Sequence, residues 1–357
     1  MNTKKLSKAA KDIKPYRPAP PLKDIPKDQG TVLKLNSNEN LFLTRKQVQE
    51  VLLEAAYETD PRLYPQDEEQ QLIQKIATLN KVESSQVMIT AGGDQLIELL
   101  FSLLRPGDRV TAVFPTFSMY PRAAQQRGVN LVEAFLEPDF SLNPEKTLEL
   151  AKGSELLVIC NPNNPTGNQF PEESVIKLIE GFDGLVLLDE AYQEYSEYTL
   201  AELVKDYDNL IILRTFSKAY GLAGLRLGYC LACEELVSTL REKYMMPYPV
   251  SNLILRAGIK MVDQSTTVLD SVGEAKQERA WLISELNKVP GVEAYPSDAC
   301  FVLFKTEKPI NLVYEALINQ GIIISRQTVF EEEYLRVTVA PRKLGMRFIE
   351  GLREATK

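Results

Sequence analysis

Short apolar runs alternate along this chain with longer segments of helical spacing. The runs are continuous in apolar residues, and they occupy residues 110–114, 156–160, 185–188, 210–213 and 225–231. Strands that are apolar on both faces, with helices between them, are typical of a parallel sheet covered on both sides. The pattern therefore predicts an α/β fold in which a mostly parallel central sheet is flanked by helices.

Helical spacing predicts helices over residues 45–57 and 68–79, and a third helix after a short strand at 87–90. In that third helix, leucines at 96, 99, 100 and 103 form a buried stripe. The turn between strand and helix contains Gly92, Gly93 and Asp94. Such a turn can bind a phosphate at the helix N-terminus, although it is more often only a tight connection.

Prolines divide the chain into an arm and two domains. The segment 1–35 is rich in proline and lysine, which disfavours helix and predicts an extended arm against the small domain or a partner subunit. Pro247 and Pro249 interrupt a helical segment and mark the expected boundary between a large domain, 36–247, and a small domain, 248–357. In the small domain we expect helices at 274–288, 311–319 and 346–356 and strands at 301–304, 322–324 and 334–339, an α+β pattern.

Composition narrows the class of protein. The chain has 357 residues, of which 44% are hydrophobic and 25% charged, as in ordinary globular proteins. A formal net charge of -8 argues against nucleic-acid binding, which needs a basic surface. No apolar run is long enough to span a bilayer, and the first residues lack the features of a signal peptide. We therefore expect a cytoplasmic protein with neither nucleic acid nor membrane as partner.

The chain contains no histidine, and this excludes several kinds of site. Ser-His-Asp hydrolysis, Cys-His nucleophiles and histidine-based zinc sites are all removed. Cys230 and Cys233 form a Cys-x-x-Cys pattern, but we expect both in one strand, where such positions face opposite sides. A redox or metal site is therefore disfavoured there, and a general base must be Lys, Asp, Glu, Tyr or Cys.

Polar residues follow several of the predicted strands. They are Asp94 after the first strand, Asn164 after the strand ending at 160, Asp189 after the strand ending at 188, and Lys218 after the strand ending at 213. In open parallel sheets, ligands bind beyond the carboxyl ends of the strands. We therefore expect these residues to converge on one edge of the sheet.

Lys218 and its neighbours suit an aldehyde cofactor that carries a phosphate. A buried lysine loses its charge readily, and a neutral amine forms a Schiff base with an aldehyde. Thr215, Ser217 and Arg226 offer hydroxyls and a guanidinium to a phosphate. Pyridoxal 5'-phosphate (PLP) has both groups.

The other strand-end residues suit the ring of such a cofactor. Asp189 could keep a pyridine nitrogen protonated, Tyr192 and Asn164 could donate to a phenolate oxygen, and Phe117 could stack on the ring. Taken singly, each has an ordinary alternative as a helix cap, a turn former or a core residue. Four such coincidences at the ends of four strands favour the cofactor.

These motifs resemble those of a known family. Asn-Pro-Asn-Asn-Pro-Thr-Gly at 161–167, Asp-Glu-Ala-Tyr at 189–192 and the segment from Ser217 to Arg226 resemble the class I/II aminotransferases of PLP fold type I. The segments 36–40, 62–65, 91–94 and 335–338 look most like those of histidinol-phosphate aminotransferase. The order and spacing match over essentially the whole chain.

The resemblance implies roles for individual residues. Lys218 would be the Schiff-base lysine and catalytic base, with Asp189 at the pyridine nitrogen and Tyr192 and Asn164 at the phenolic oxygen. Phe117 would lie against the ring. The implied phosphate ligands are Gly93, Asp94, Thr215, Ser217 and Arg226, with Tyr64 entering from the other subunit of a homodimer. The implied substrate-binding residues are Tyr16, Asn38, Tyr64, Arg326 and Arg336, of which Tyr16 and the two arginines would meet the acidic end.

The implied reaction is ping-pong transamination of histidinol phosphate with 2-oxoglutarate, a step of histidine biosynthesis. An aromatic amino acid aminotransferase, a lyase like threonine-phosphate decarboxylase, and a non-catalytic PLP-binding regulatory module are the alternatives. The chain departs from the family pattern at Cys300, where asparagine is usual, at 340–342, which read Ala-Pro-Arg, and after Pro18, where a glycine is missing. These departures concern the substrate side.

Overall fold

The computed structural model describes residues 32–357 together with residues 3, 11, 13 and 15. Most of the predicted arm, including Tyr16, lies outside the described residues. Where the arm ends, β1 (Leu33–Lys34) pairs in parallel with β11 (Ile322–Ile323). Leu33 and Leu35 are buried in the core of the C-terminal part, so this end of the arm is attached to that part.

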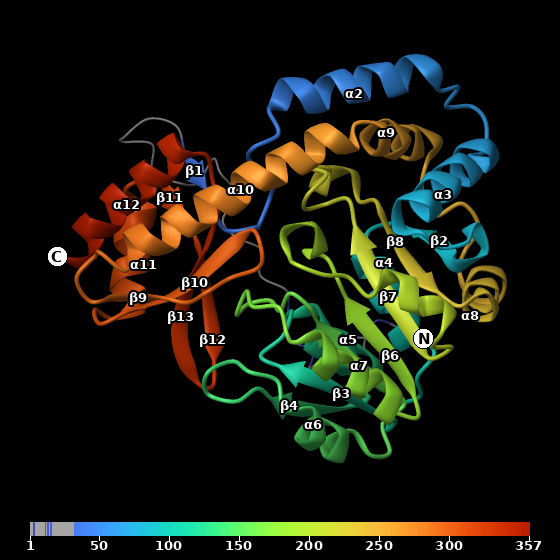
Figure 1. The fold of residues 1–357 in the computed structure, drawn as a ribbon, viewed down its shortest axis with the longest axis horizontal. Helices are drawn as coiled ribbons and strands as arrows, with labels where there is room; N and C mark the ends of the chain where they lie inside the picture. The colour runs from blue at the N-terminus through green and yellow to red at the C-terminus, as the bar shows by residue number, and fades with distance from the viewer. Residues whose placement is uncertain (1–2, 4–10, 12, 14, 16–31) are drawn as a thin grey trace.

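A seven-stranded sheet forms the centre of the larger part (Figure 1). Its order is β2-β8-β7-β6-β5-β3-β4, and every neighbouring pair is parallel except those of β8, which runs antiparallel to both β2 and β7. The predicted PLP fold type I, with its mostly parallel sheet, is thereby confirmed. The strands are β2 (Val87–Thr90), β3 (Arg109–Phe114), β4 (Asn130–Phe135), β5 (Leu156–Cys160), β6 (Leu185–Asp189), β7 (Leu210–Thr215) and β8 (Gly228–Ala232).

Two details of this sheet differ from the sequence prediction. β4 was not expected, because it lies at the edge and most of its side chains are at least partly exposed, so it has no continuous apolar run. The strand expected at 225–231 begins only at Gly228, because Arg226 adopts a left-handed conformation with φ 54°. Cys233 lies beyond this strand, at the N-cap of α8 (Glu234–Thr239).

Helices cover both faces of the sheet. On one face, α4 (Gly93–Ser102), α5 (Met119–Arg127) and α8 share a core with Leu187 and Ile211. On the other face, the helices share a core with Leu188 and Ile212. They are α2 (Arg45–Glu58), α3 (Gln66–Asn80), α6 (Pro144–Ala151), α7 (Glu172–Gly181) and α9 (Asn252–Asp263). Of these, α2 packs on α9.

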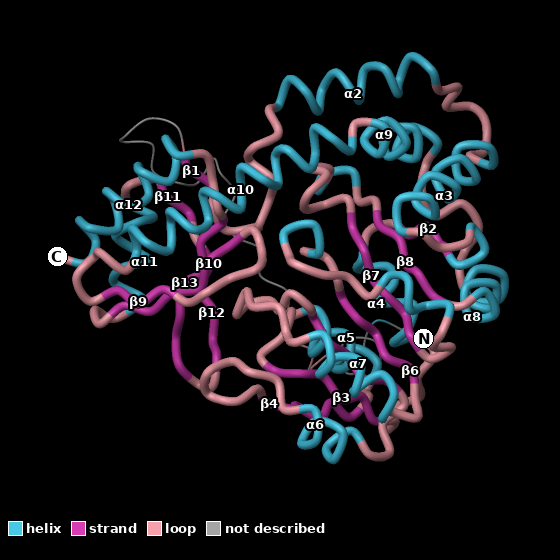
Figure 2. The backbone as a smooth tube through the Cα atoms, in the orientation of Figure 1, coloured by secondary structure: helices cyan, strands magenta, loops and turns pink. Residues whose placement is uncertain are grey.

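The C-terminal part has a four-stranded antiparallel sheet and a core of its own. The long helix α10 (Ser265–Leu286) runs from α9 to this part, as the tube in Figure 2 shows. α9 follows residue 247, yet it packs against α2 and α3 of the larger part. The remaining elements are β9 (Val292–Ala294), β10 (Phe301–Thr306), α11 (Ile310–Asn319), β12 (Ser325–Val329), β13 (Glu332–Thr338) and α12 (Arg342–Thr356). Within the described residues, no helix is long and apolar enough to cross a membrane.

Candidate active site

A cavity lies at the carboxyl ends of β2, β3, β5, β6 and β7. β2 and β7 are both antiparallel to β8, so they share a direction, and the segments that follow them reach the same edge. The cavity is lined by all of the predicted cofactor-binding residues except Tyr64, namely Gly93, Asp94, Phe117, Asn164, Asp189, Tyr192, Thr215, Ser217, Lys218 and Arg226. The structure thus brings together segments up to about 130 residues apart in sequence.

Lys218 follows β7 and extends its amine into this cavity. Its Nζ donates a hydrogen bond to the carbonyl oxygen of Ser37 at 2.9 Å and lies 5.6 Å from the centre of the Tyr192 ring. Burial lowers the pKa of Lys218 from its ordinary value, and the nearby charge of Arg336 acts in the same direction. Since the neutral amine is the nucleophilic and basic form, this environment favours both functions.

Asp189 ends β6 and is buried at the floor of the cavity. Its Oδ2 accepts a hydrogen bond from the Tyr120 hydroxyl at 2.7 Å, and its Oδ1 accepts one from the backbone N–H of Ala191 at 3.0 Å. Burial raises the pKa of Asp189, while these hydrogen bonds and the Cys160 thiol oppose the rise. Such a carboxylate could form an ion pair with a protonated ring nitrogen.

Tyr192 stands between the cavity and the C-terminal part. Its hydroxyl accepts a hydrogen bond from Nδ2 of Asn38 at 2.9 Å, and its ring meets Phe301 edge to face. Burial raises the pKa of Tyr192 above its ordinary value, so the phenol stays protonated. Because Asn38 donates to its oxygen, the Tyr192 O–H remains free to donate to a group in the cavity.

The glycines at the ends of β2 and β8 bring two backbones close together. Gly92 has φ +76°, and α4 begins at Gly93, so its N-terminal N–H groups point toward the cavity. A Cβ on Gly228 would lie 2.9 Å from the backbone of Gly92. Arg226 Nη2 donates to Asp94 Oδ2 at 2.8 Å across this contact. A helix N-terminus, a guanidinium and two hydroxyls (Thr215 and Ser217) thus surround a space suited to a phosphate.

Arg336, on β13, is buried beside the same cavity. It donates through Nη1 to Oδ1 of Asn164 and through Nη2 to the carbonyl oxygen of Asn36 at 3.1 Å. Its Nε is buried with no hydrogen-bond partner among the described residues. Burial lowers the pKa of Arg336. A buried guanidinium with an unused donor is suited to an acidic ligand group.

Two predicted substrate or phosphate residues lie away from the cavity, and a third is not described. Tyr64 is 78% exposed and stacks on Tyr248, with ring centres 4.9 Å apart. Arg326, on β12, is exposed and lies over the Tyr314 ring, 4.8 Å from its centre. Tyr16 lies outside the described residues. Within this protomer the structure therefore does not place Tyr64 or Arg326 at the cavity.

Some residues of the site were not found by sequence reasoning. Tyr120 supports Asp189 from α5, and the Ser37 carbonyl holds Lys218. Cys300, which the sequence marks as a departure from the family pattern, directly precedes β10, and its Sγ lies 3.6 Å from the Asn38 carbonyl oxygen. Neither a tyrosine on an amphipathic helix nor a backbone carbonyl carries a sequence signal, so only the fold reveals these contacts.

The residues present fit PLP. The lysine has a pKa shifted toward the neutral amine, the buried carboxylate lies at the floor, and the glycine cradle leaves room for a phosphate at the N-terminus of α4. Each group stands on a different strand end of one rigid sheet, so their mutual geometry is set by the fold.

Comparison with known proteins agrees with this geometry. Residues 30–346 match the family model described as aminotransferase class I and II. The histidinol-phosphate aminotransferase of Methanosarcina mazei is 35% identical over 349 residues, covering 94% of this chain and 92% of the relative. That of Caldanaerobacter subterraneus is 33% identical over 326 residues, covering 90% and 92%.

The fold is also shared with solved structures. The histidinol-phosphate aminotransferase of Sinorhizobium meliloti in complex with pyridoxal 5'-phosphate superposes with a TM-score of 0.85 at 23% identity, covering 97% of this chain and 99% of that one. Because the family model spans most of the chain and the relatives cover nearly all of it, the chain belongs to the class I and II aminotransferases and is a PLP-dependent enzyme similar to histidinol-phosphate aminotransferases.

Proposed function

We propose that this enzyme transfers an amino group between histidinol phosphate and 2-oxoglutarate, a step of histidine biosynthesis. The observation that carries the proposal is Arg336, a buried arginine that donates to Asn164 of the cavity lining and whose Nε has no hydrogen-bond partner in the part of the chain that the structure describes. It suits a substrate with an acidic end, as both partners of this reaction have. The names of the most similar curated relatives, which are 31–35% identical, support the choice of donor.

The cofactor's ligands follow from the cavity lining. Lys218 would hold the aldehyde, Asp189 would face the pyridine nitrogen, and Tyr192 and Asn164 would donate to the phenolic oxygen. Phe117 lies against the ring. The N–H groups of Gly93 and Asp94, the hydroxyls of Thr215 and Ser217, and Arg226 hold the phosphate. When bound, PLP supplies an aldehyde carbon and an electron-withdrawing ring.

Lys218 is the proton carrier of the proposed mechanism. Its Nζ is the amine that lines the cavity, and burial lowers its pKa, which favours the neutral, basic form. With the cofactor bound, Nζ would be placed to accept the amino donor's α-proton and to donate it again. Tyr192, whose ring lies 5.6 Å from Nζ, limits where the amine can move. Arg336 and Asn38 orient the donor's acidic end.

We further propose a homodimer in which Tyr64 reaches the phosphate of the partner's cofactor. Leu63, Tyr64 and Met246 are exposed by 66%, 78% and 77% and lie on neighbouring segments, because Tyr64 stacks on Tyr248. Asn252 donates to the carbonyl oxygens of Asp60 and Leu63 and so fixes this loop. An exposed apolar surface of this kind suits a second copy of the chain. Cytoplasmic location stays a prediction.

The test uses purified holoenzyme, with the absorbance of bound cofactor as its signal. Histidinol phosphate, phenylalanine and threonine phosphate are added in separate experiments. We expect histidinol phosphate alone to convert the cofactor to its amine form, and 2-oxoglutarate to reverse the change. A response to phenylalanine instead would indicate an aromatic aminotransferase. Release of carbon dioxide from threonine phosphate would indicate a lyase. Cofactor binding with no turnover of any substrate would indicate a regulatory module.

A further inference from the structure

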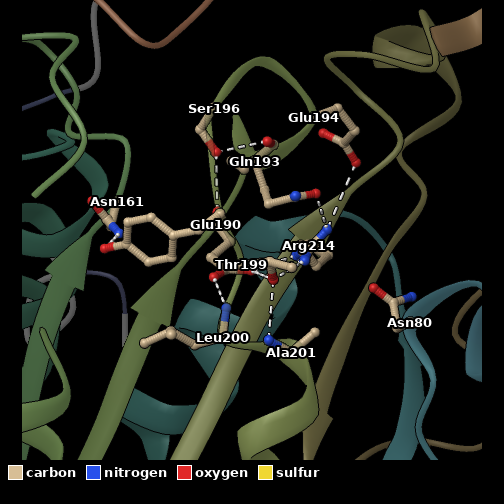
Figure 3. Close-up of polar contacts among 12 residues, drawn as sticks. Asn80, Asn161, Glu190, Gln193, Glu194, Ser196, Thr199, Leu200, Ala201 and Arg214 are labelled. Atoms are coloured by element: carbon tan, nitrogen blue, oxygen red, sulfur yellow. Dashed lines mark hydrogen bonds and ion pairs between the residues drawn. The ribbon is translucent and has the colours of Figure 1, made fainter. Parts of the chain in front are cut away.

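Arg214 and Glu190 form a buried ion pair (Figure 3) on the face of the sheet opposite the proposed active site. Arg214, on β7, donates through Nε to Oε2 of Glu190 at 2.9 Å, and its Nη2 lies 2.8 Å from the same oxygen. The side chains are 4% and 1% exposed. No role in the proposed reaction has so far been given to either residue.

Side-chain alternation explains why the pair lies there. Along β7, Leu213 and Thr215 line the cavity, so Arg214 between them points to the other face. Asp189 lines the cavity at the end of β6, so Glu190, the next residue, also points away. The backbone continues the same register, because Glu190 N–H donates to the Leu213 carbonyl oxygen at 3.0 Å.

Arg214 holds more than Glu190. Its Nη1 donates to Oε1 of Gln193 at 2.8 Å, and its Nη2 donates to the Thr199 hydroxyl at 2.7 Å. Glu190 in turn accepts from the Thr199 hydroxyl at 2.8 Å and from the backbone N–H of Leu200 at 3.0 Å. Figure 3 shows these side chains converging on one guanidinium.

Three members of this network adjoin residues that line the cavity. Glu190 follows Asp189, Gln193 follows Tyr192, and Arg214 precedes Thr215 in the segment that leads to Lys218. The fork of an arginine fixes several acceptors in one plane, which the single ammonium of a lysine cannot do. One side chain therefore joins two segments of the site, 189–193 and the segment from Arg214 to Lys218.

We propose that Arg214, paired with Glu190, is the positioning residue that fixes Asp189, Tyr192 and the Lys218 segment relative to one another from behind the sheet. This inference rests on the proposed roles of those three residues. It predicts that loss of the pair displaces these three residues relative to one another, even in a protein that remains folded.

The test compares two double variants of the full-length protein. Arg214→Met with Glu190→Gln removes both charges of the pair and keeps the volume and an acceptor for Leu200 N–H. It also removes the cation from Glu194, whose Oε1 lies 3.8 Å from Arg214 Nη1, so the unfolding midpoint is measured beside the site readouts. Arg256→Met with Glu68→Gln removes a partly buried pair, 3.4 Å apart, that joins α9 to α3 away from the site, and serves as the matched control. Measurements are the PLP dissociation constant of the apoprotein, kcat and KM, the pH midpoint of cofactor absorbance, and the unfolding midpoint.

We expect the Arg214 and Glu190 double variant to bind PLP about 10-fold more weakly and to lose about 10- to 100-fold in kcat, since small displacements at a reacting centre have effects of this size. KM should change much less, and the pH midpoint of cofactor absorbance should move. The control should change the unfolding midpoint alone. If the Arg214 and Glu190 variant keeps wild-type PLP affinity, kcat and pH midpoint while its unfolding midpoint falls, the pair is only structural and the proposal is overturned.

Milder variants keep the proposal testable if the double variant does not fold. Arg214→Lys preserves the charge but not the fork, and Gln193→Leu removes only the contact next to Tyr192. Both should shift the pH midpoint of cofactor absorbance and lower kcat by less than the double variant, and unchanged values in both would contradict the proposal. Borohydride trapping of PLP on Lys218 in the wild type separates a failure of this inference from a failure of the proposed function.

Discussion

The two sides of the active site are built differently. The cofactor side stands on consecutive strand ends of one sheet, and all its predicted residues within a protomer except Tyr64 line a single cavity. The substrate side draws on unrelated elements, with Asn38 next to the arm and Arg336 on β13. The third predicted residue, Arg326 on β12, lies at the surface. A sheet fixes its ligands from one scaffold, whereas a site assembled from separate parts depends on how those parts meet.

Removing the central lysine tests the cofactor side most strongly. Lys218→Ala should abolish covalent attachment of PLP and lower kcat by at least about 10⁴-fold, because both the nucleophile and the proton carrier are lost. Borohydride reduction followed by peptide mass analysis detects the attachment. Lys276→Ala is the control, since its Nζ donates to the Ser196 carbonyl oxygen outside the cavity. A Lys218→Ala protein that still labels or turns over would contradict the assignment.

The two arginines test the substrate side. Arg336→Lys should lower kcat/KM by about 100-fold for both half-reactions, since truncating a buried partner of an acidic group costs about 2–5 kcal/mol. Arg326→Lys should cost less than about 10-fold, because that side chain is exposed and stacked on Tyr314. Steady-state kinetics on each substrate decide between them. A larger loss of kcat/KM for Arg326→Lys than for Arg336→Lys would indicate that the acidic group binds at β12 and not at β13.

Mixed dimers test whether the cofactor side is completed by the partner subunit. Tyr64→Ala should weaken PLP binding by about 10-fold, the equivalent of one hydrogen bond of about 1.4 kcal/mol. In a hybrid of a Tyr64→Ala subunit with a Lys218→Ala subunit, a tyrosine acting across the interface leaves one site fully intact. The hybrid should then regain wild-type PLP affinity at half the sites. Hybrids whose working site keeps the weakened affinity would place Tyr64 in its own subunit's site.

The smallest expected effect concerns stability and pH. Burial lowers the pKa of Lys218, so the folded apoprotein binds fewer protons there than the unfolded chain does at pH values between the lowered pKa and the ordinary value of 10.5. The free-energy cost that burial of Lys218 adds to folding is greatest below the lowered pKa, and it decreases as the pH rises to 10.5. Lys218→Met should therefore be more stable than wild-type apoprotein at pH 7, with the gap narrowing toward pH 10 in urea unfolding. A stability difference between the two proteins that widens with pH would contradict a lowered pKa of Lys218.

Much of the cofactor side could be predicted from the sequence because strand ends carry a strong signal. β5, β6 and β7 each begin with a run of at least four apolar residues, and recognisable chemistry such as Asp189 follows these runs. The antiparallel direction of β8 could not be predicted in this way, because an apolar run reports burial and not direction. The edge strand β4 has too few buried residues to form such a run.

The substrate side could be predicted less well, for a physical reason. Whether Arg326 or Arg336 is buried depends on which face of the antiparallel sheet packs toward the larger part, and alternation along a hairpin does not decide this. The buried position of Arg214 could have been predicted from the sequence. A charged residue in an otherwise apolar strand, beside a glutamate at the end of the neighbouring strand, indicates a buried pair, since neither charge is stable alone.

The close approach of Gly228 to Gly92 has a consequence for the order of folding. In the described chain β2 pairs only with β8, and β8 lies about 140 residues later in sequence. The turn at Gly92 therefore cannot take its final position beside Arg226 until β8 has inserted between β2 and β7. Contacts that span so many residues form slowly. A growing chain shorter than residue 232 thus lacks the completed phosphate cradle, and during refolding the gain of cofactor affinity should report the insertion of this one strand.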